Sequence, residues 1–494
     1  MSATLFRHAR VLTMDAALPR ADAVLVQNDV IVAVGAEHEV AARAGDARRV
    51  DCAGDVLAPA FVDAHCHLLA TAACRLSVDC SPTAVRSIAD IQARLRQAAD
   101  RRMDGWIRAA GYDEAQLVER RHPTRVDLDA AVPHLPVRLL HRSGHAVVLN
   151  TPAMLAAGIG NETPEPPGAV IDRVPGTGEP SGLLLEMNDV VDRVVPPLPY
   201  ADLAPAVEET ARAFITAGIT AICDATPTNG AREWETFARL QADGRLPLDV
   251  TLMEGVEHAK EIPSKAQVGL RRGHVKIMLS EVGGTLTPNE DELARIVREI
   301  HRTGRDVAIH AVEERAVAAS IDAIAAALAE QPRLHRHRIE HAALLPEGAA
   351  ERMAALGVTI VTQPAFLFEH GDRYLRDVPP EHHARLYPIA DLLRAGVMVA
   401  ASTDAPVSAV DPLEGMRAAI ARRTRDAAVV GQEEAVGFGD ALRMWTSSAA
   451  HACGTEATRG RIAPGMAADL VLLHGDVAEM QVVDVWRRGE RLFP

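Results

Sequence analysis

Residues 60–67 read Ala60-Phe61-Val62-Asp63-Ala64-His65-Cys66-His67, an apolar run that ends in two histidines. Short apolar runs of this kind are typical of strands that are buried on both faces of a parallel sheet. Side chains two residues apart on a strand point to the same side, so His65 and His67 can face one space together. The stretch therefore predicts a buried parallel strand that presents a histidine pair at its carboxyl end.

Seven similar apolar runs follow, and helical patterns lie between most of them. The eight strand candidates are 60–66, 219–225, 248–253, 274–279, 306–310, 337–341, 358–363 and 397–403. Helical periodicity is clear from Glu290 to Arg302 and from Ala311 to Glu330. Alternating strands and helices indicate a parallel sheet, and eight strands favour its closure into an α/β fold of the (β/α)8 TIM-barrel type. An open doubly wound sheet is the competing fold, and no G-x-G-x-x-G after an early strand supports it.

The rest of the chain divides into β-rich ends and one long insertion. Residues 1–57 and 458–494 read as short strands with turns, which predicts a small composite β-sandwich built from both termini. The barrel domain then spans residues 58–457. Because the gap between the first two barrel strands is too long for a simple connection, residues 70–203 are predicted to be an insertion after strand 1.

Composition limits the classes of partner and the compartment. The 494 residues are 48% hydrophobic, and the formal net charge of −15 argues against a nucleic-acid surface and, more weakly, against anionic membranes. No uncharged apolar stretch of about 18 residues predicts a transmembrane helix. Six cysteines without a C-x-x-C pair, and no apolar core of a secretory signal, indicate a cytoplasmic protein with reduced thiols.

Other strand candidates also end in residues that can bind a metal. Lys276 lies within one of them, and His310, His341 and Asp404 lie at or just after the ends of three others. The carboxyl ends of barrel strands meet in one mouth, where imidazoles and carboxylates suit one or two divalent cations. A single such histidine is more often a hydrogen-bonded core residue, but several in register favour a metal site.

Two of these residues have competing interpretations. A buried Lys276 must be paired, and a partner such as Glu281 is the simpler solution, whereas carbamylation by CO2 would turn the amine into an anionic bridge between two metals. Asp404 could serve as a helix N-cap or turn residue, or it could bind a metal and take a proton from water. Glu340, which precedes His341, is expected to point to the opposite face and to act as a support.

Taken together, these residues favour hydrolysis. A bound cation lowers the pKa of water toward about 7 and polarises a carbonyl group, and Asp404 can then move the proton. A redox reaction is less favoured, because the ligands are mostly hard and no nearby cysteine completes a thiolate site. Without a carbamylated lysine, the remaining ligands could still hold one ion.

The ordered set of His-x-His, Lys, His, His and Asp resembles the amidohydrolase superfamily. Flanking motifs narrow the resemblance to the amidohydrolase family 3 branch, which includes N-substituted formamide deformylases, along nearly the whole chain. The stretches that carry it are residues 57–67, 143–150, 178–182 with Glu186, 338–342, Gln363-Pro364, 403–406 and 465–471.

The resemblance implies a barrel with a composite β-sandwich, zinc or a similar divalent cation, and hydrolysis of a C–N bond. The substrate class is a small amide, formamide or cyclic amide. The implied metal ligands are His65, His67, His310, His341 and Asp404, with Lys276 as a carbamylated bridge. The implied catalytic residues are Asp404 and His145, and the implied substrate-binding residues are His145, Glu186 and Gln363.

Other functions remain open at this point. The same activated water would serve a deaminase or an esterase. A barrel that has lost catalysis and acts as a binding or assembly protein is less favoured, because every expected ligand position is kept. A small-molecule substrate is the expected partner, and a homodimer is one expectation for the quaternary state.

Overall fold

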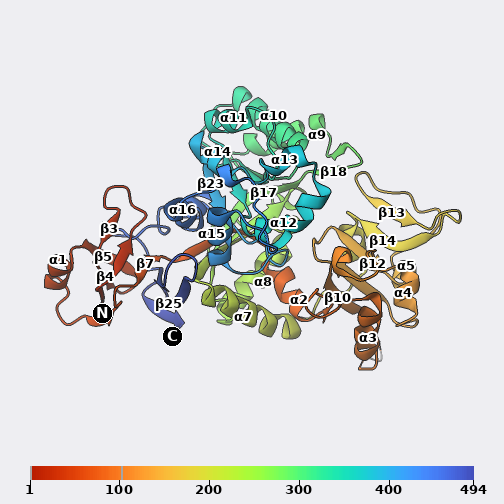
Figure 1. Ribbon diagram of the computed structural model, residues 1–494, viewed down its shortest axis with the longest axis horizontal. Helices are drawn as coiled ribbons and strands as arrows, with labels where there is room; N and C mark the ends of the chain where they lie inside the picture. Colours follow the sequence, from red (N-terminus) through yellow and green to blue (C-terminus); the bar gives the residue numbers. More distant parts are fainter. Residues whose placement is uncertain (1–2, 102–103, 494) are drawn as a thin grey trace. The chain divides into compact units, whose positions relative to one another are not determined.

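The computed structural model describes residues 3–101 and 104–493, and the chain divides into two units. Unit 1 comprises Met1–His67, Ala211–Ser280 and Pro288–Pro494, and unit 2 comprises Leu68–Thr210 and Glu281–Thr287. Unit 1 holds a parallel barrel together with sheets from both ends of the chain, whereas unit 2 is built around one mixed sheet (Figure 1).

Unit 1 contains the eight predicted strands in one sheet. Their order is β8 (Phe61–Cys66), β15 (Ile219–Asp224), β16 (Asp249–Gly255), β17 (Leu270–Met278), β20 (Val307–Ala311), β21 (Arg338–His341), β22 (Thr359–Thr362) and β23 (Met398–Ala401). Every neighbouring pair runs parallel. The sheet confirms the α/β fold predicted from the alternating sequence pattern.

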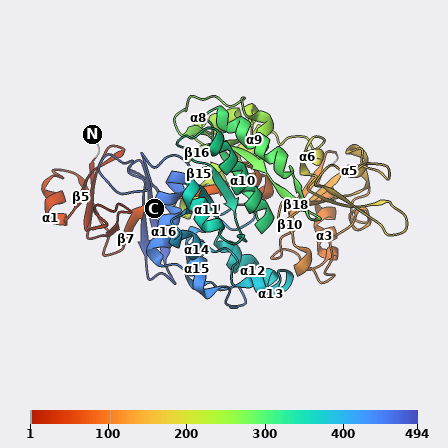
Figure 2. The same ribbon diagram turned by 90° about the horizontal axis from the view of Figure 1, so that it is seen from above.

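Helices follow most of these strands and surround them (Figure 2). They are α7 (Tyr200–Thr216), α8 (Ala231–Ala242), α9 (Glu290–Arg302), α10 (Glu314–Glu330), α11 (Ala349–Leu356), α12 (Ala365–Asp377), α13 (Pro380–His383), α14 (Ile389–Arg394), α15 (Pro412–Ala421), α16 (Phe438–Trp445) and α17 (Ser447–Ala452). Helix α9 has the bounds that its sequence predicts. The side chain of Asn289 caps its first turn, and Leu293, Val297 and Ile300 form its buried face.

A seam between the first and last strands closes the barrel. The buried Asp63 carboxylate on β8 accepts hydrogen bonds from the backbone amide of Thr403 at 3.1 Å and from its hydroxyl at 2.5 Å. Two backbone bonds continue the seam, from Asp404 N to His65 O and from His67 N to Ala405 O, both at 2.8 Å. The chain after β23 is thereby fixed beside the histidine pair.

Strands from both chain ends form two further sheets in unit 1. One has the order β5 (Val30–Gly35), β4 (Ala23–Gln27), β1 (Ala3–Arg7), β6 (Arg48–Asp51). The other has the order β26 (Glu490–Phe493), β25 (Gln481–Arg487), β24 (Leu470–His474), β7 (Val56–Pro59), β2 (Arg10–Leu12), β3 (Arg20–Ala21). Phe6 and Trp486 pack edge to face at 4.8 Å within one hydrophobic cluster. The two ends of the chain therefore share a core.

Unit 2 is built on a six-stranded sheet. Its order is β13 (Val170–Arg173), β14 (Pro180–Leu185), β12 (Ala146–Leu149), β11 (Val137–His141), β10 (Ile107–Tyr112), β9 (Val78–Asp79). Its helices are α2 (Leu68–Arg75), α3 (Ile88–Ala99), α4 (Arg125–Asp129), α5 (Thr151–Ala156) and α6 (Asn188–Asp192). Because β10 runs parallel to β11, the carboxyl ends of these two strands lie at the same edge of the sheet.

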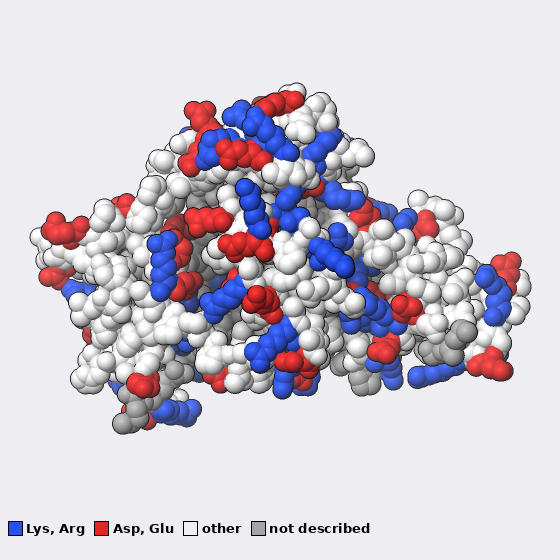
Figure 3. All heavy atoms as spheres, turned by 180° about the vertical axis from the view of Figure 1, so that it is seen from behind, with Lys and Arg blue, Asp and Glu red and all other residues white. Residues whose placement is uncertain are grey.

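The surface carries both signs of charge. On the face drawn in Figure 3, acidic and basic side chains are interspersed. Among the described residues, no helix combines the length and hydrophobicity needed to cross a bilayer.

Two buried histidines, His301 and His337, form a hydrogen-bonded network. His337 Nδ1 accepts the backbone N–H of Val307 at 3.1 Å, so the ring proton sits on Nε2. That proton is directed to His301 Nδ1 at 2.8 Å, and His301 Nε2 donates to the Gln331 carbonyl at 2.7 Å. Burial lowers the pKa of His337 to about 3, against the opposing effect of Asp306. The His337 ring is therefore neutral in the folded state.

Protonation of His337 should make the fold sensitive to acid. Its folded pKa lies below the unfolded value of about 6.5, so as pH falls the unfolded chain takes up the proton first. The neutral His337 contributes to the free energy of unfolding above pH 6.5. This contribution is lost as pH falls toward 3, by up to about 1.4 kcal/mol per pH unit. Melting temperatures measured from pH 7 to 4 should fall less steeply in His337→Gln than in the wild-type protein.

The matched control is His134→Gln, which removes an exposed histidine. Its profile should follow that of the wild-type protein. Equal slopes for all three proteins would show that the buried network does not set the acid sensitivity.

Candidate metal centre at the barrel mouth

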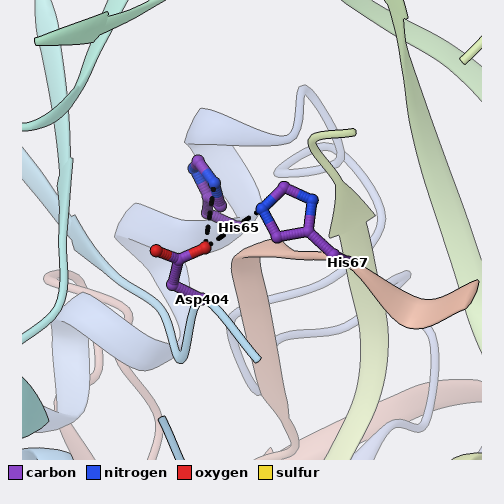
Figure 4. A group of neighbouring side chains, drawn as sticks. All are labelled: His65, His67 and Asp404. Atoms are coloured by element: carbon purple, nitrogen blue, oxygen red, sulfur yellow. Dashed lines mark ion pairs between the residues drawn. The ribbon is translucent and has the colours of Figure 1, made fainter. Parts of the chain in front are cut away.

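His65, His67 and Asp404 meet at the carboxyl end of the barrel (Figure 4). One ligand atom from each lies within 4.8 Å of the other two. His65 Nε2 is 3.4 Å and His67 Nε2 is 3.1 Å from the same oxygen, Asp404 Oδ1. Their convergence follows from the seam, which ties the ends of β8 and β23 together.

Asp404 is held as a carboxylate in a left-handed backbone conformation. Its φ of 56° is one that aspartate tolerates better than most residues. Burial by itself would raise the pKa of this side chain. The imidazoles of His65, His341 and His67 instead hold its pKa well below the usual range. An anion that stays deprotonated at neutral pH suits both metal binding and proton acceptance.

A buried ion pair sets the orientation of His65. His65 Nδ1 donates to Glu340 Oε2 at 2.5 Å, and Arg338 holds the same carboxylate through contacts of 2.5 and 2.9 Å. Arg338 also donates to the carbonyls of Ala64 and Ala452. Because Nδ1 carries the proton, Nε2 is left with its lone pair toward Asp404. Burial lowers the pKa of His65 to about 3, so the ring is neutral.

The direction of Glu340 corrects the expectation from strand alternation. Glu340 and His341 were expected on opposite faces, with Glu340 pointing away from the mouth. In the structure both lie beside His65. The reason is the backbone of His341, whose φ of 71° breaks the regular alternation at the end of β21. The expected supporting role agrees with the hydrogen bond to His65.

His341 and His310 extend the cluster. The His341 ring centroid lies 5.1 Å from that of His65 and 4.5 Å from that of His310. His341 Nδ1 lies 3.9 Å from Asp404 Oδ2 and donates to Gln363 Oε1 at 2.8 Å. Gln363 is fully buried, and its amide also donates to Ser402 Oγ at 3.0 Å. Gln363 thus holds the His341 ring in place, and its expected contact with substrate stays a prediction.

Lys276 is one of three lysines in the sequence, with Lys260 and Lys265. It is 2% exposed in β17, and burial lowers its pKa. The negative charges of Glu340 and Asp404 oppose that shift, and its own charge lowers the pKa of His65 and His341. The lysine is thus an electrostatic neighbour of the cluster, and its role as a metal ligand stays a prediction.

The donor set fits a divalent cation. Among the described residues, Asp404 Oδ1 and His341 Nε2 are buried atoms without a hydrogen bond. Buried polar atoms rarely stay unsatisfied, and both of these belong to groups that bind metals. With their ring protons on Nδ1, His65 and His341 each present a free lone pair on Nε2. His67 Nδ1 lies 2.9 Å from Thr226 Oγ1, which leaves its Nε2 toward Asp404.

His145 and Glu186 form a separate pair in unit 2. His145 Nδ1 lies 2.8 Å from Glu186 Oε1, and Glu186 N donates to the His145 carbonyl at 2.9 Å. The two side chains are 42% and 28% exposed, so both are accessible to a ligand. Glu186 has a φ of 54°, an uncommon value for glutamate. The structure brings these two residues together, as one pair.

Sequence patterns did not identify three residues that organise the centre. Asp63, Thr403 and Arg338 carry the seam and the ion pair, yet the pattern of strand-end ligands does not include them. One signal was available, since an ionisable residue inside a buried strand must find a partner. Both Asp63 and Arg338 stand in strands whose residues are all buried.

Arg338→Met should destabilise the fold by about 3–5 kcal/mol, because it leaves the buried Glu340 carboxylate without its cation. Arg338→Met combined with Glu340→Gln should recover a large part of that loss, since the unpaired charge is gone. Urea unfolding of the wild-type protein, both single variants and the double variant measures the coupling. Additive losses would contradict the role given to this ion pair.

The chain matches the amidohydrolase family over residues 48–493. It is 30% identical to an N-substituted formamide deformylase of Arthrobacter pascens, an alignment that covers 98% of this chain and 96% of that protein. It is 26% identical to the putative amidohydrolase YtcJ of Bacillus subtilis, over 92% of this chain and 91% of the relative. An uncharacterized metal-dependent hydrolase from Pyrococcus horikoshii superposes with a TM-score of 0.77 at 21% identity, over 100% of both chains. The chain therefore belongs to the amidohydrolase family.

Proposed function

We propose that this protein is a metal-dependent amidohydrolase that cleaves a C–N bond of a small amide, formamide or cyclic amide with an activated water. The observation that carries the proposal is the convergence of His65 Nε2 and His67 Nε2 on Asp404 Oδ1, a buried oxygen without a hydrogen bond among the described residues. Family membership supports the same reaction class. The formamide deformylase relative favours formamides as the first substrates to test.

The residues proposed to hold the cation are His65, His67, His310, His341 and Asp404. Their imidazole and carboxylate donors suit zinc, and a similar divalent ion would fit the same set. When bound, the ion supplies a Lewis acid that polarises the carbonyl group and lowers the pKa of water toward about 7.

The buried charges favour carbamylation of Lys276. Asp404 and Glu340 are anions, and Arg338 and a protonated Lys276 are cations, so this set is neutral before any metal enters. Addition of one divalent cation would leave an uncompensated charge of plus two in a buried site, which is costly. Conversion of Lys276 to a carbamate changes its charge from plus one to minus one, and this change balances one divalent ion.

Asp404 is the residue proposed to move the proton. Its carboxylate accepts a proton from the attacking water as the new C–O bond forms. It then returns that proton to the leaving nitrogen as the C–N bond breaks. A formamide would give formate and an amine. His145, oriented by Glu186, is proposed to bind the substrate, a role that rests on the resemblance and on the exposed ion pair.

His67→Ala should lose most of its bound metal and its hydrolytic activity, because it removes one of the three converging ligand atoms. The measurements are metal content per chain and hydrolysis of a panel of formamides, acyl amides and cyclic ureas. His134→Ala, which alters an exposed histidine, is the control. Equal metal content and equal hydrolysis in all three proteins would contradict the proposal. Release of ammonia would instead indicate deamination, and hydrolysis of esters alone would indicate an esterase.

Lys276→Ala should abolish activity, and a short carboxylic acid should restore part of it by replacing the carbamate. Protein loaded with metal in ¹³C-bicarbonate should show a carbamate resonance by ¹³C NMR that this variant lacks. Lys265→Ala removes an exposed lysine and should keep the resonance. A wild-type protein without the resonance but with full activity would favour a single ion held without the lysine.

A further inference from the structure

A second cluster of possible metal ligands lies in unit 2, at the edge of its sheet. Tyr112 at the end of β10 is paired with His141 at the end of the parallel strand β11. Asp113 and Glu114 directly follow β10. The carboxyl ends of neighbouring parallel strands therefore bring two carboxylates beside one imidazole.

The ligand atoms in this cluster are close together. One atom from each of Asp113, Glu114 and His141 lies within 4.8 Å of the other two. His141 Nε2 is 2.8 Å from Glu114 Oε2, and His122 Nδ1 is 4.0 Å from the same oxygen. Ligand atoms about 2.0–2.2 Å from a tetrahedral zinc lie roughly 3.3–3.6 Å apart, so small side-chain rotations would suffice.

The Nε2 atom of His141 supplies an independent sign of a ligand. The side chain is 4% exposed, and this atom has no hydrogen bond of acceptable geometry among the described residues. Its close polar contact is Glu114 Oε2 at 2.8 Å, an ion-pair distance. Asp404 Oδ1 at the barrel mouth shows the same combination of burial, a close imidazole nitrogen and no hydrogen bond. Groups that meet in this way can share a cation.

The other ring nitrogen of His141 can take the proton that metal binding requires. His141 Nδ1 lies 2.8 Å from Ser143 Oγ, which can accept this proton. A metal-binding histidine commonly donates its second N–H to such a partner. Without metal, the Ser143 amide at 3.2 Å can donate to Nδ1 instead, and the ring proton then sits on Nε2.

We propose that Asp113, Glu114 and His141 form a second divalent-cation site, separate in the chain from the ligands at the barrel mouth. The mixed nitrogen and oxygen donors suit zinc or manganese. A bound ion would join the ends of β10 and β11. His122, whose Nδ1 lies 2.9 Å from the Tyr112 hydroxyl, is a candidate fourth ligand.

The competing interpretation is an ion-pair cluster without metal. Asp113 also caps the short 3-10 helix Glu114–Gln116, and its carboxylate lies 3.7 Å from Arg142 Nη1. This cation would repel a metal ion. Removal of its charge therefore separates the two interpretations, because it should strengthen metal binding and would weaken a salt-bridge cluster.

The test counts zinc ions in the full-length protein. Chelator-treated protein is titrated with zinc by calorimetry, and bound zinc is measured after gel filtration. His141→Gln should bind one equivalent fewer than the wild-type protein, and His67→Ala should keep the equivalent that His141→Gln loses. His134→Gln is the control for loss of an exposed histidine. Arg142→Gln should bind zinc severalfold more tightly at the second site.

Spectroscopy of cobalt-substituted protein covers the case in which His141→Gln does not fold. His67→Ala loaded with Co²⁺ should still show visible d–d bands, and the further change Glu114→Gln should remove them. Equal zinc stoichiometry in the wild-type protein and His141→Gln would overturn the proposal. So would the absence of cobalt bands in His67→Ala.

Discussion

The seam between β8 and β23 positions the candidate centre. A parallel barrel needs its first and last strands side by side, and the ladder of barrel strands runs from β8 through to β23. Asp63 bonds Thr403, and backbone bonds join His65 to Asp404 and His67 to Ala405. The bonds that close the barrel therefore also bring the histidine pair beside the Asp404 carboxylate. The same contacts hold the fold together and position the candidate metal ligands.

The fold and the ligand types could be predicted from sequence because both depend on short-range patterns. Eight apolar runs predicted the strands, and the helical periodicity of Glu290–Arg302 predicted a helix with the observed ends. The surroundings of the ligands could not be predicted in the same way. The positive φ of His341 brings Glu340 and His341 to one site. The alternation of side chains along a strand does not predict this backbone conformation. Likewise, the two bonds made by the Gln363 amide depend on partners from different strands.

Charge, rather than apolar packing, organises the buried space beneath the mouth. Barrel interiors are usually filled by branched apolar side chains. Here Arg338, Glu340 and Lys276 are all buried, and the first two are fully paired. Such pairs add little net stability, because desolvation offsets their attraction. Their benefit is orientation, since Glu340 fixes which nitrogen of His65 faces Asp404. The protein thus gives up some stability to hold one tautomer in place.

The length of chain that the seam spans has a consequence for biosynthesis. Asp63 and Thr403 are 340 residues apart. At a translation rate of roughly 5–20 residues per second, β23 leaves the ribosome tens of seconds after β8. During that interval the nascent chain carries an open parallel sheet with an unpaired edge, a form prone to mispairing with other chains. Chaperone protection during this window is thus a foreseeable requirement for producing the enzyme in quantity.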